Sequence, residues 1–463
     1  MEKEMQIQSN RTDKLAKGLL LLGLSLGYFM VLLDMTVVSV ALPAIRAELG
    51  GGISGLQWVV NAYTIVFASF LLSMGAFADK LGAKRVYTGG LALFLAASAI
   101  SAAVSTLGAL IGLRTILGIG GAALMPASLT LLAHAYPGPA ERARALGSWA
   151  AVTGAAMAAG PVVGGLLVDS FGWRSIFLLN VPLAGISLIM TFLFVRETDR
   201  KPRKSFDFWG QITVIVAIAA LSFGLMEGET YGWNSPVIFA SFSLALLSAI
   251  LFLIVEAKGK TPLLPLRLFR NATVSAGMLA GMAINIGLSG ILFVLPLFFQ
   301  QTRGLSAHIA GLALLPMMIP LALNPILTGR IVGRIGARIP MTLGFSLGAV
   351  GTLLQVWTEV NTSYVITMIG LLLIGFGVSF TIPSLMAAVI SSVPKEQTGA
   401  VSGALNSSRQ LGATLGVAIL GSILSGSKSF IDGMHMSLIV TTIILFGGSL
   451  LSFAFIGRKQ ERQ

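Results

Sequence analysis

The stretch Gly75-Ala-Phe-Ala-Asp-Lys-Leu-Gly-Ala-Lys-Arg85 returns in the second half of the chain as Gly329-Arg-Ile-Val-Gly-Arg-Ile-Gly-Ala-Arg-Ile339. Gly75 aligns with Gly329, and Gly82 aligns with Gly336. Each copy is a short polar segment that joins two long apolar runs. Such an internal repeat indicates that the chain consists of two related halves.

The composition excludes a water-soluble domain. Hydrophobic residues make up 55% of the 463 residues and only 11% are charged, whereas soluble domains carry about 25% charged residues. Apolar runs of about 20 residues, each long enough to cross the hydrocarbon core of a bilayer, recur along the whole chain. Backbone groups in lipid must be hydrogen-bonded internally, and runs of this length form helices rather than barrel strands. The predicted fold class is an all-α polytopic membrane protein.

We expect fourteen transmembrane helices. Their predicted positions are 18–44, 56–77, 86–105, 108–133, 146–168, 176–195, 210–226, 236–255, 273–299, 309–328, 341–357, 364–390, 400–424 and 435–456. Two adjoining six-helix halves would place the second copy of the repeat after the eighth span, but it follows the tenth. Two extra helices, spans seven and eight, are therefore predicted between the halves.

The expected domain division follows from this count. It consists of a cytoplasmic tail at 1–17, a six-helix bundle at 18–195, a linker with the two extra helices at 196–260, a second six-helix bundle at 261–456 and a cytoplasmic tail at 457–463. Of the 31 Lys and Arg residues, those outside the spans fall mostly on the side of the N-terminus. The opposite side holds only Arg46, Arg174, Arg303 and Lys428. The positive-inside rule then places both termini in the cytoplasm.

Several function classes are excluded by what the sequence lacks. It has no Cys and only three scattered His, so we expect neither disulfides nor a metal site. It has no nucleotide-binding P-loop, which excludes ATP as the driving force, and no nucleophile–base set, which argues against an enzyme. The net charge of +13 reflects orientation in the membrane rather than nucleic-acid binding. We expect no cofactor other than a coupling proton.

The motifs, taken in order, resemble the major facilitator superfamily, and in particular its fourteen-span drug:proton antiporter branch. The segments that carry the resemblance are Leu33–Pro43, Gly75–Arg85, Arg114–Gly120, Gly154 with Gly160–Gly165, Trp173–Pro182 and Gly399–Gln410. Leu117 stands where the family usually has Gln. The resemblance covers nearly the whole chain. It implies the major facilitator fold and export of drugs in exchange for protons.

Asp34 and Arg114 are the candidates for proton coupling. Asp34 is the only carboxylate deep in a predicted span, and a charge at that depth is costly unless it is paired, hydrated or protonated. Desolvation favours the protonated form of a carboxyl group and a neighbouring cation favours the ionised form, so a changing environment could exchange a proton. Arg114 stays protonated and would tune Asp34. The alternatives are structural: Asp34 bonded to Thr36, and Arg114 bonded to backbone carbonyls.

The resemblance implies that the Gly75–Arg85 loop is a cytoplasmic gate. Its proposed members are Gly75, Asp79, Gly82, Lys84, Arg85, Glu141 and Arg142. Asp79 could neutralise a helix N-terminus, with the start of span thirteen near Thr398–Gly403 as the expected partner and Arg142 as a salt-bridge partner. The alternative is a static turn.

Two further groups of residues are candidates. The fifth-span antiporter motif comprises Gly154, Gly160, Pro161, Gly164 and Gly165, whose small residues permit close helix contact. Candidates for the substrate path are Trp58, Asn61, Tyr63, Asn406, Arg409 and Gln410. Aromatic rings with a carboxylate would suit a lipophilic cation. The same polar residues could instead interlock helices.

The predicted function is proton-coupled efflux by alternating access in a bacterial cytoplasmic membrane. The expected substrates are amphipathic, often cationic drugs, so multidrug efflux and antibiotic resistance are the predicted roles. The expected partners are a small-molecule substrate, protons and the lipid bilayer, without ATP or nucleic acid, and a monomer suffices. Open alternatives are a narrow exporter of one metabolite, antibiotic or organic anion, and a non-transporting channel or scaffold.

Overall fold

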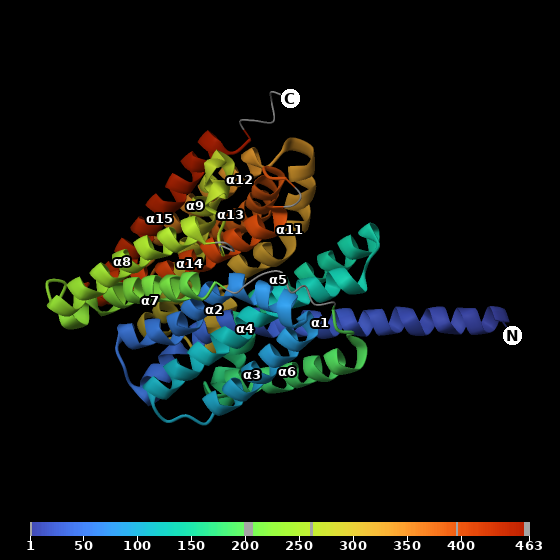
Figure 1. Cartoon of the computed structure of the whole chain (residues 1–463). Coiled ribbons are helices and arrows are strands. Elements are labelled where there is room, and N and C mark those ends of the chain that lie inside the picture. Colours follow the sequence, from blue (N-terminus) through green and yellow to red (C-terminus); the bar gives the residue numbers. More distant parts are fainter. Residues whose placement is uncertain (1, 199–206, 260–262, 395–396, 458–463) are drawn as a thin grey trace.

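A computed structural model describes residues 2–198, 207–259, 263–394 and 397–457, and the regular secondary structure within them is helical (Figure 1). The helices are α1 (Glu2–Leu49), α2 (Ile53–Leu81), α3 (Ala83–Ser101), α4 (Leu107–Ala135), α5 (Pro139–Phe171), α6 (Ser175–Phe194), α7 (Phe208–Tyr231), α8 (Pro236–Lys258), α9 (Ala272–Leu297), α10 (Ala307–Ala313), α11 (Leu315–Ile335), α12 (Arg338–Gln355), α13 (Tyr364–Ser391), α14 (Thr398–Ser425) and α15 (Phe430–Phe455). A 3-10 segment, η1 (Leu266–Arg270), precedes α9, and a π-helical segment, η2 (Phe298–Thr302), follows it. Residues 199–206 of the expected linker, Lys260, Lys395 and the tail from 458 onward lie outside the described residues.

Eleven of the described helices are long and apolar enough to cross a membrane. Helices α3, α12 and α14 coincide with three more expected spans but fall outside this set. For α14 the reason is its polar middle, which contains Asn406, Arg409 and Gln410. Because α14 packs against α2, α7 and α9, its polar residues can face protein instead of lipid. The count of fourteen therefore stays a prediction.

The expected span at 309–328 is divided into α10 and α11 at Leu314. Pro316 follows in the first turn of α11, and a proline has no backbone N–H to continue the hydrogen bonds of a preceding helix. The chain therefore restarts its helix at this point.

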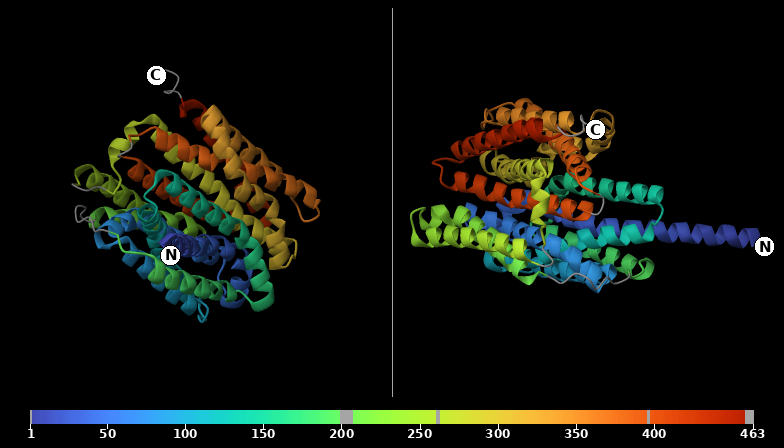
Figure 2. Two further views of the ribbon diagram at one scale, coloured as in Figure 1. Left: turned by 90° about the vertical axis from the view of Figure 1, so that its right-hand side faces the viewer. Right: turned by 45° about the horizontal axis from the view of Figure 1, so that its top comes forward.

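Two groups of helices repeat one packing pattern. In the N-terminal group (α1–α6), α1 packs on α5 and α6, α4 packs on α2 and α3, and α3 packs on α6. In the C-terminal group (α9–α15), α9 packs on α14 and α15, α13 packs on α11 and α12, and α12 packs on α15. Figure 2 shows the two groups mainly on opposite sides of the molecule. Gly82 ends α2 with φ 100° and Gly336 ends α11 with φ 80°, a region that favours glycine.

Helices α7 and α8 form a pair that packs on α2 and α14, where the two groups meet (Figure 1). Gln211 of α7 donates a hydrogen bond to the Ser69 carbonyl oxygen of α2 (3.0 Å). Near the other end of α7, Glu227 accepts hydrogen bonds from the Ser54 hydroxyl (2.5 Å) and the Trp58 indole (2.9 Å). The pair is therefore fastened to α2 at two levels.

Close helix contact in the C-terminal group depends on glycines in α12 and α13. A Cβ atom on Gly351 would lie 2.6 Å from the Gly370 carbonyl oxygen and 2.8 Å from the Ile374 amide nitrogen. Backbone atoms cannot move aside as a flexible side chain can, so these positions require small residues.

Replacing Gly351 by Leu should lower the melting temperature of the detergent-purified protein, because the two helices would have to separate. Overpacking of this kind costs about 1–3 kcal/mol. Gly89→Leu is the matched control, since a Cβ atom at Gly89 meets nothing within 4 Å. Equal melting temperatures of the two variants in a thermal-shift assay would contradict this account of the packing.

Candidate functional site

A buried ion pair lies inside the N-terminal group of helices. The side chains of Asp34 (α1) and Arg114 (α4) are each 1% exposed, and the guanidinium contacts one carboxylate oxygen. The Arg114 Nε donates a hydrogen bond to the Val59 carbonyl oxygen of α2 (2.9 Å), and the guanidinium carbon lies 4.5 Å from the centre of the Tyr63 ring. Arg114 therefore links α1 and α2. Buried charges persist only when they are paired and hydrogen-bonded in this way.

Asn180 of α6 contacts the second carboxylate oxygen of Asp34. Its amide nitrogen donates hydrogen bonds to this oxygen (2.9 Å) and to the Ser98 hydroxyl oxygen of α3 (3.1 Å). Its Oδ1 is buried and has no partner among the described residues. Thr36, the alternative partner expected for Asp34, instead donates to backbone carbonyl oxygens of α1 (both 3.2 Å).

A cavity of about 510 Å³ lies between the two groups of helices. Its lining comes from α1, α2, α4 and α5 and from α9, α11, α13 and α14. The volume lies within the range of small-molecule sites, about 300–1,000 Å³. The lining includes Met35, Met125, Met157 and Met386, and methionine adapts to ligands of different shape.

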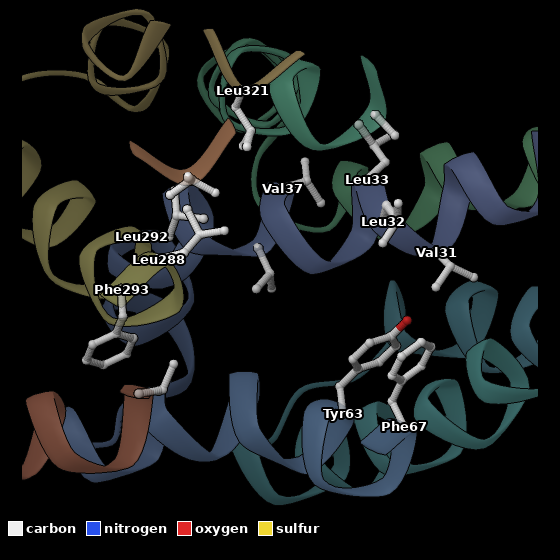
Figure 3. Close-up of a cluster of buried hydrophobic side chains, with 14 of the residues drawn as sticks. Val31, Leu32, Leu33, Val37, Tyr63, Phe67, Leu288, Leu292, Phe293 and Leu321 are labelled. Atoms are coloured by element: carbon white, nitrogen blue, oxygen red, sulfur yellow. The ribbon is translucent and has the colours of Figure 1, made fainter. Parts of the chain in front are cut away.

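Figure 3 shows part of the apolar wall, with Leu32 on α1, Leu288 and Leu292 on α9 and Leu321 on α11. The walls of the cavity therefore come from both groups, and any relative movement of the groups changes its shape.

The ion pair and the cavity occupy different faces of α1. Tyr28, Leu32, Met35 and Ser39 line the cavity, and their spacing defines one face of a helix. Asp34 is not part of this lining. A bound molecule in the cavity would therefore not contact the carboxylate in this conformation.

The predicted polar face of α14 lies on the cavity. Asn406, Arg409 and Gln410 all line it, and Arg409 is the one charged side chain in the described lining. The Arg409 Nη1 donates a hydrogen bond to the Asn406 Oδ1 (3.3 Å). The buried Arg409 Nε has no partner among the described residues.

The three substrate-path candidates in α2 lie outside the described lining of the cavity. Trp58 bonds to Glu227 of α7. Asn61 is buried and donates a hydrogen bond to the Thr414 carbonyl oxygen of α14 (3.2 Å). Tyr63 is buried beneath the Arg114 guanidinium. The structure thus places Tyr63 with the ion pair and Asn61 at the contact between the two groups.

We call the side of Gly82 and Gly336 the loop side of the molecule, and the opposite side the far side. Hydrogen bonds join the two groups toward the far side. Gln57 of α2 donates to two backbone carbonyl oxygens of α14 (both 2.9 Å). Asp169, near the end of α5, accepts from the backbone N–H groups of Ala307 and His308 at the start of α10 (3.1 and 2.9 Å). These contacts hold the two groups together on the far side.

The glycines of the antiporter motif lie where α5 meets its neighbours. Gly160 and Gly164 face α1, Gly165 and Pro161 face α10, and Gly154 lines the cavity. A Cβ atom on Gly164 would lie 2.5 Å from a methyl carbon of Val37 and 2.9 Å from its carbonyl oxygen. The motif therefore brings α5 close to α1 and to the C-terminal group at once.

The Gly75–Arg85 loop is fastened to the segment after α6. The Glu197 carboxylate accepts hydrogen bonds from the backbone N–H groups of Lys84 (2.9 Å) and Arg85 (3.2 Å) at the start of α3. The Lys84 ammonium donates to the Val195 carbonyl oxygen (2.7 Å). Glu197 is thus the acid at the N-terminus of α3, a position that favours a negative charge.

The expected latch between Asp79 and the start of α14 is not formed in this conformation. Within the described chain, Asp79 makes no hydrogen bond or ion pair with Thr398–Gly403. Arg142 donates to the Tyr136 carbonyl oxygen (3.1 Å), and Glu141 is exposed. Gly75 lies near Pro126 of α4, with 3.8 Å between that ring and a Cβ atom at Gly75. The members of the expected gate are therefore not joined to α14 by the Asp79 contact in this conformation.

Sequence reasoning missed the roles of several polar residues, namely Gln57, Asp169, Asn180, Glu197 and Glu227. Asn180 had a usable signal, because it is an amide inside an apolar run and within a family motif. The others lie near helix ends, where polar residues are ordinary, so their long-range partners could not be inferred from the sequence.

Comparisons with known proteins agree on one family. Residues 24–417 match the model of the Major Facilitator Superfamily. The chain is 37% identical over 439 residues to the methylenomycin A resistance protein of Bacillus subtilis (strain 168), covering 94% of each chain. It is 35% identical over 416 residues to the multidrug resistance protein Stp of Mycobacterium tuberculosis (strain ATCC 25618 / H37Rv), covering 90% of this chain and 76% of that protein.

A solved structure with the same fold is a bacterial homologue of the human lysosomal transporter Spinster. It has a TM-score of 0.67 and 16% identity and covers 95% of this chain and 96% of that one. The family model, the close relatives and the repeated helix packing lead to one conclusion: this chain is a member of the major facilitator superfamily.

Proposed function

We propose that this protein exports small amphipathic compounds, including antibiotics and other drugs, in exchange for protons by alternating access. The observation that carries the proposal is the buried Asp34–Arg114 pair next to a cavity of drug-sized volume. Relatives named for multidrug and methylenomycin A resistance support the substrate class. A scaffold would need neither a costly buried charge pair nor such a cavity.

The proposed topology has fourteen spans, with six in each half, two between them and both termini in the cytoplasm. The matching packing of the two groups supports the six-helix halves. The excess of Lys and Arg on the loop side supports a cytoplasmic position for that side. The described conformation is then closed toward the outside. The membrane is the bacterial cytoplasmic membrane, and no cofactor other than the coupling proton is involved.

Protonation of Asp34 would act through Arg114. Uptake of a proton removes the charge that attracts the guanidinium, whereas the bonds of Arg114 to Val59 and Tyr63 of α2 remain. Val59 lies between Gln57 and Asn61, which hold α2 against α14. A change at Asp34 can therefore reach the outer closure along α2.

Asn180 is suited to both protonation states of Asp34. Its amide nitrogen donates to the carboxylate, and its unpaired Oδ1 could accept the O–H of a protonated carboxyl group after the amide turns over. This residue therefore positions Asp34.

Replacing Asp34 by Asn should abolish export driven by a pH gradient, because the side chain can no longer exchange a proton. Substrate binding should persist, since Asp34 lies outside the cavity lining. The measurement is substrate-dependent proton movement in proteoliposomes, with the exposed Asp432→Asn as the control for loss of a carboxylate. Transport at the wild-type rate in Asp34→Asn would remove this residue from the mechanism.

Replacing Asn180 by Leu should lower the rate of proton-coupled transport, because the Asp34 carboxylate loses the amide group that positions it. Substrate binding should persist, since Asn180 lies outside the cavity lining. Ser98→Ala, which removes only a second partner of the Asn180 amide, should give a smaller loss. The measurement is substrate-dependent proton movement in proteoliposomes, and a wild-type rate in Asn180→Leu would contradict the assigned role of Asn180.

Replacing Asp169 by Asn should loosen the outer closure, because the charged acceptor of two α10 backbone N–H groups is lost. The sequence has no Cys, so Gly154→Cys in the cavity would serve as a unique reporter for a membrane-impermeant maleimide. Labelling from outside should rise when Asp169→Asn is added. Gly108→Cys, exposed near the outer end of α4, should label equally in both backgrounds; an unchanged Gly154→Cys signal would argue against this closure.

A further inference from the structure

The charge on the walls of the cavity is positive. Among the described residues that line it, Arg409 alone carries a formal charge, and no carboxylate is present. Asp34 cannot compensate, because it faces away from the cavity and is paired with Arg114. A guanidinium stays protonated in proteins. The cavity is therefore electropositive.

The donors of Arg409 are left available. Its Nη1 has one long hydrogen bond to Asn406 (3.3 Å) and its buried Nε has no partner among the described residues, although a guanidinium offers five N–H donors. Its electrostatic neighbour is the Tyr28 hydroxyl. A guanidinium with free donors on a mainly apolar cavity is suited to bind an anion through charge-assisted hydrogen bonds.

A second unpaired donor lies on the same cavity. Trp149 of α5 is 8% exposed and its indole Nε1 has no hydrogen-bond partner among the described residues. Its ring stacks on Tyr28, with the centroids 4.9 Å apart and the planes 6° from parallel. Both rings line the cavity. They combine an N–H donor with flat apolar surface, and aromatic groups pack favourably on such surface.

We propose that the cavity takes amphipathic compounds that carry one carboxylate, or a comparable anionic group, on a flat apolar body, and that Arg409 is the residue that recognises the anion. The planar guanidinium suits bidentate binding of a carboxylate. Tyr28, Trp149 and the methionine-rich walls hold the apolar body. The inference rests on the proposed export function and narrows its substrate class to anions. The sequence had instead favoured lipophilic cations.

This charge assignment has an energetic consequence for transport. An exported anion and an imported proton both move positive charge into the cell, so an inside-negative membrane potential drives the exchange. Exchange of a monovalent cation for one proton would move no net charge. A potassium diffusion potential without a pH gradient should therefore accelerate export of an anionic substrate.

The test uses three probes with one fluorescent scaffold: 1-pyrenebutyrate, its methyl ester and a pyrenylbutyl-trimethylammonium ion. Equilibrium binding to the purified full-length protein is measured by fluorescence polarisation. The wild type should bind the carboxylate most tightly. Arg409→Gln should weaken carboxylate binding by about 10- to 100-fold, the usual effect of losing hydrogen bonds to a charged group, and leave ester binding unchanged.

Matched variants separate recognition from folding. Arg330→Gln removes an exposed guanidinium of α11 outside the cavity and should bind all three probes as the wild type does. Arg409→Lys keeps the positive charge but loses the planar guanidinium that can bind a carboxylate with two hydrogen bonds. Its affinity for the carboxylate probe should lie between those of the wild type and Arg409→Gln. Trp149→Phe keeps an aromatic ring but removes the N–H, and should weaken carboxylate binding more than ester binding, which tests the site even if Arg409→Gln fails to fold.

Two outcomes would overturn the inference: the ammonium probe binding at least as tightly as the carboxylate, or carboxylate affinity unchanged in both Arg409→Gln and Trp149→Phe. Failure of the proposed export function would give a different set of results. If the carboxylate binds in an Arg409-dependent manner but no proton gradient drives its export in proteoliposomes, the recognition site stands and proton-coupled export falls. If a proton gradient drives export of the ammonium probe independently of Arg409, proton-coupled export stands and the assignment of Arg409 as an anion-recognition residue is wrong.

Discussion

The structure depends on one constraint: a carboxylate and a guanidinium that have both been removed from water must remain next to each other. Isolated, each would carry a desolvation cost of several kcal/mol in this environment. Together, Asp34 and Arg114 form a nearly neutral unit whose remaining hydrogen bonds go to Val59 and Asn180. Four helices of the N-terminal group, α1, α2, α4 and α6, therefore meet at one charge pair.

This pair lies near the cavity and near the hydrogen bonds between α2 and α14, but it is part of neither. One face of α1 carries Asp34 while another lines the cavity, and the glycines of α5 hold α1 in close contact. On the other side of the pair, α2 continues from Val59 to the residues that bond α14. Under the proposed mechanism, protonation of Asp34 would therefore affect the cavity through α1 and the hydrogen bonds to α14 through α2. Small packed contacts of this kind shift between discrete arrangements rather than deforming gradually.

Much of the architecture could be predicted because its causes are local. Long apolar runs specify helices, and the repeated loop requires a positive φ at Gly82 and Gly336, which a sequence can reveal. The approach of Asp34 to Arg114 was inferable because two buried charges must find partners. The partners of Asp79 and Glu197 were not inferable in the same way. Both residues are acids near helix ends, and only the path of the chain after α6 determines that Glu197 reaches the start of α3.

Two arginines inside predicted spans, Arg114 and Arg409, show why residue type alone does not define a role. Arg114 has a carboxylate, a backbone carbonyl and an aromatic ring as partners, so its charge is cancelled where it lies. Arg409 has a single long contact with an amide and an unpaired donor on a cavity. Because the first site is satisfied and the second is not, the proposed mechanism assigns proton exchange and substrate binding to separate places in the molecule. Since Asp34 does not line the cavity, a substrate there would not compete with a proton for this carboxylate, and under the proposed mechanism the two would be coupled through the movement of helices.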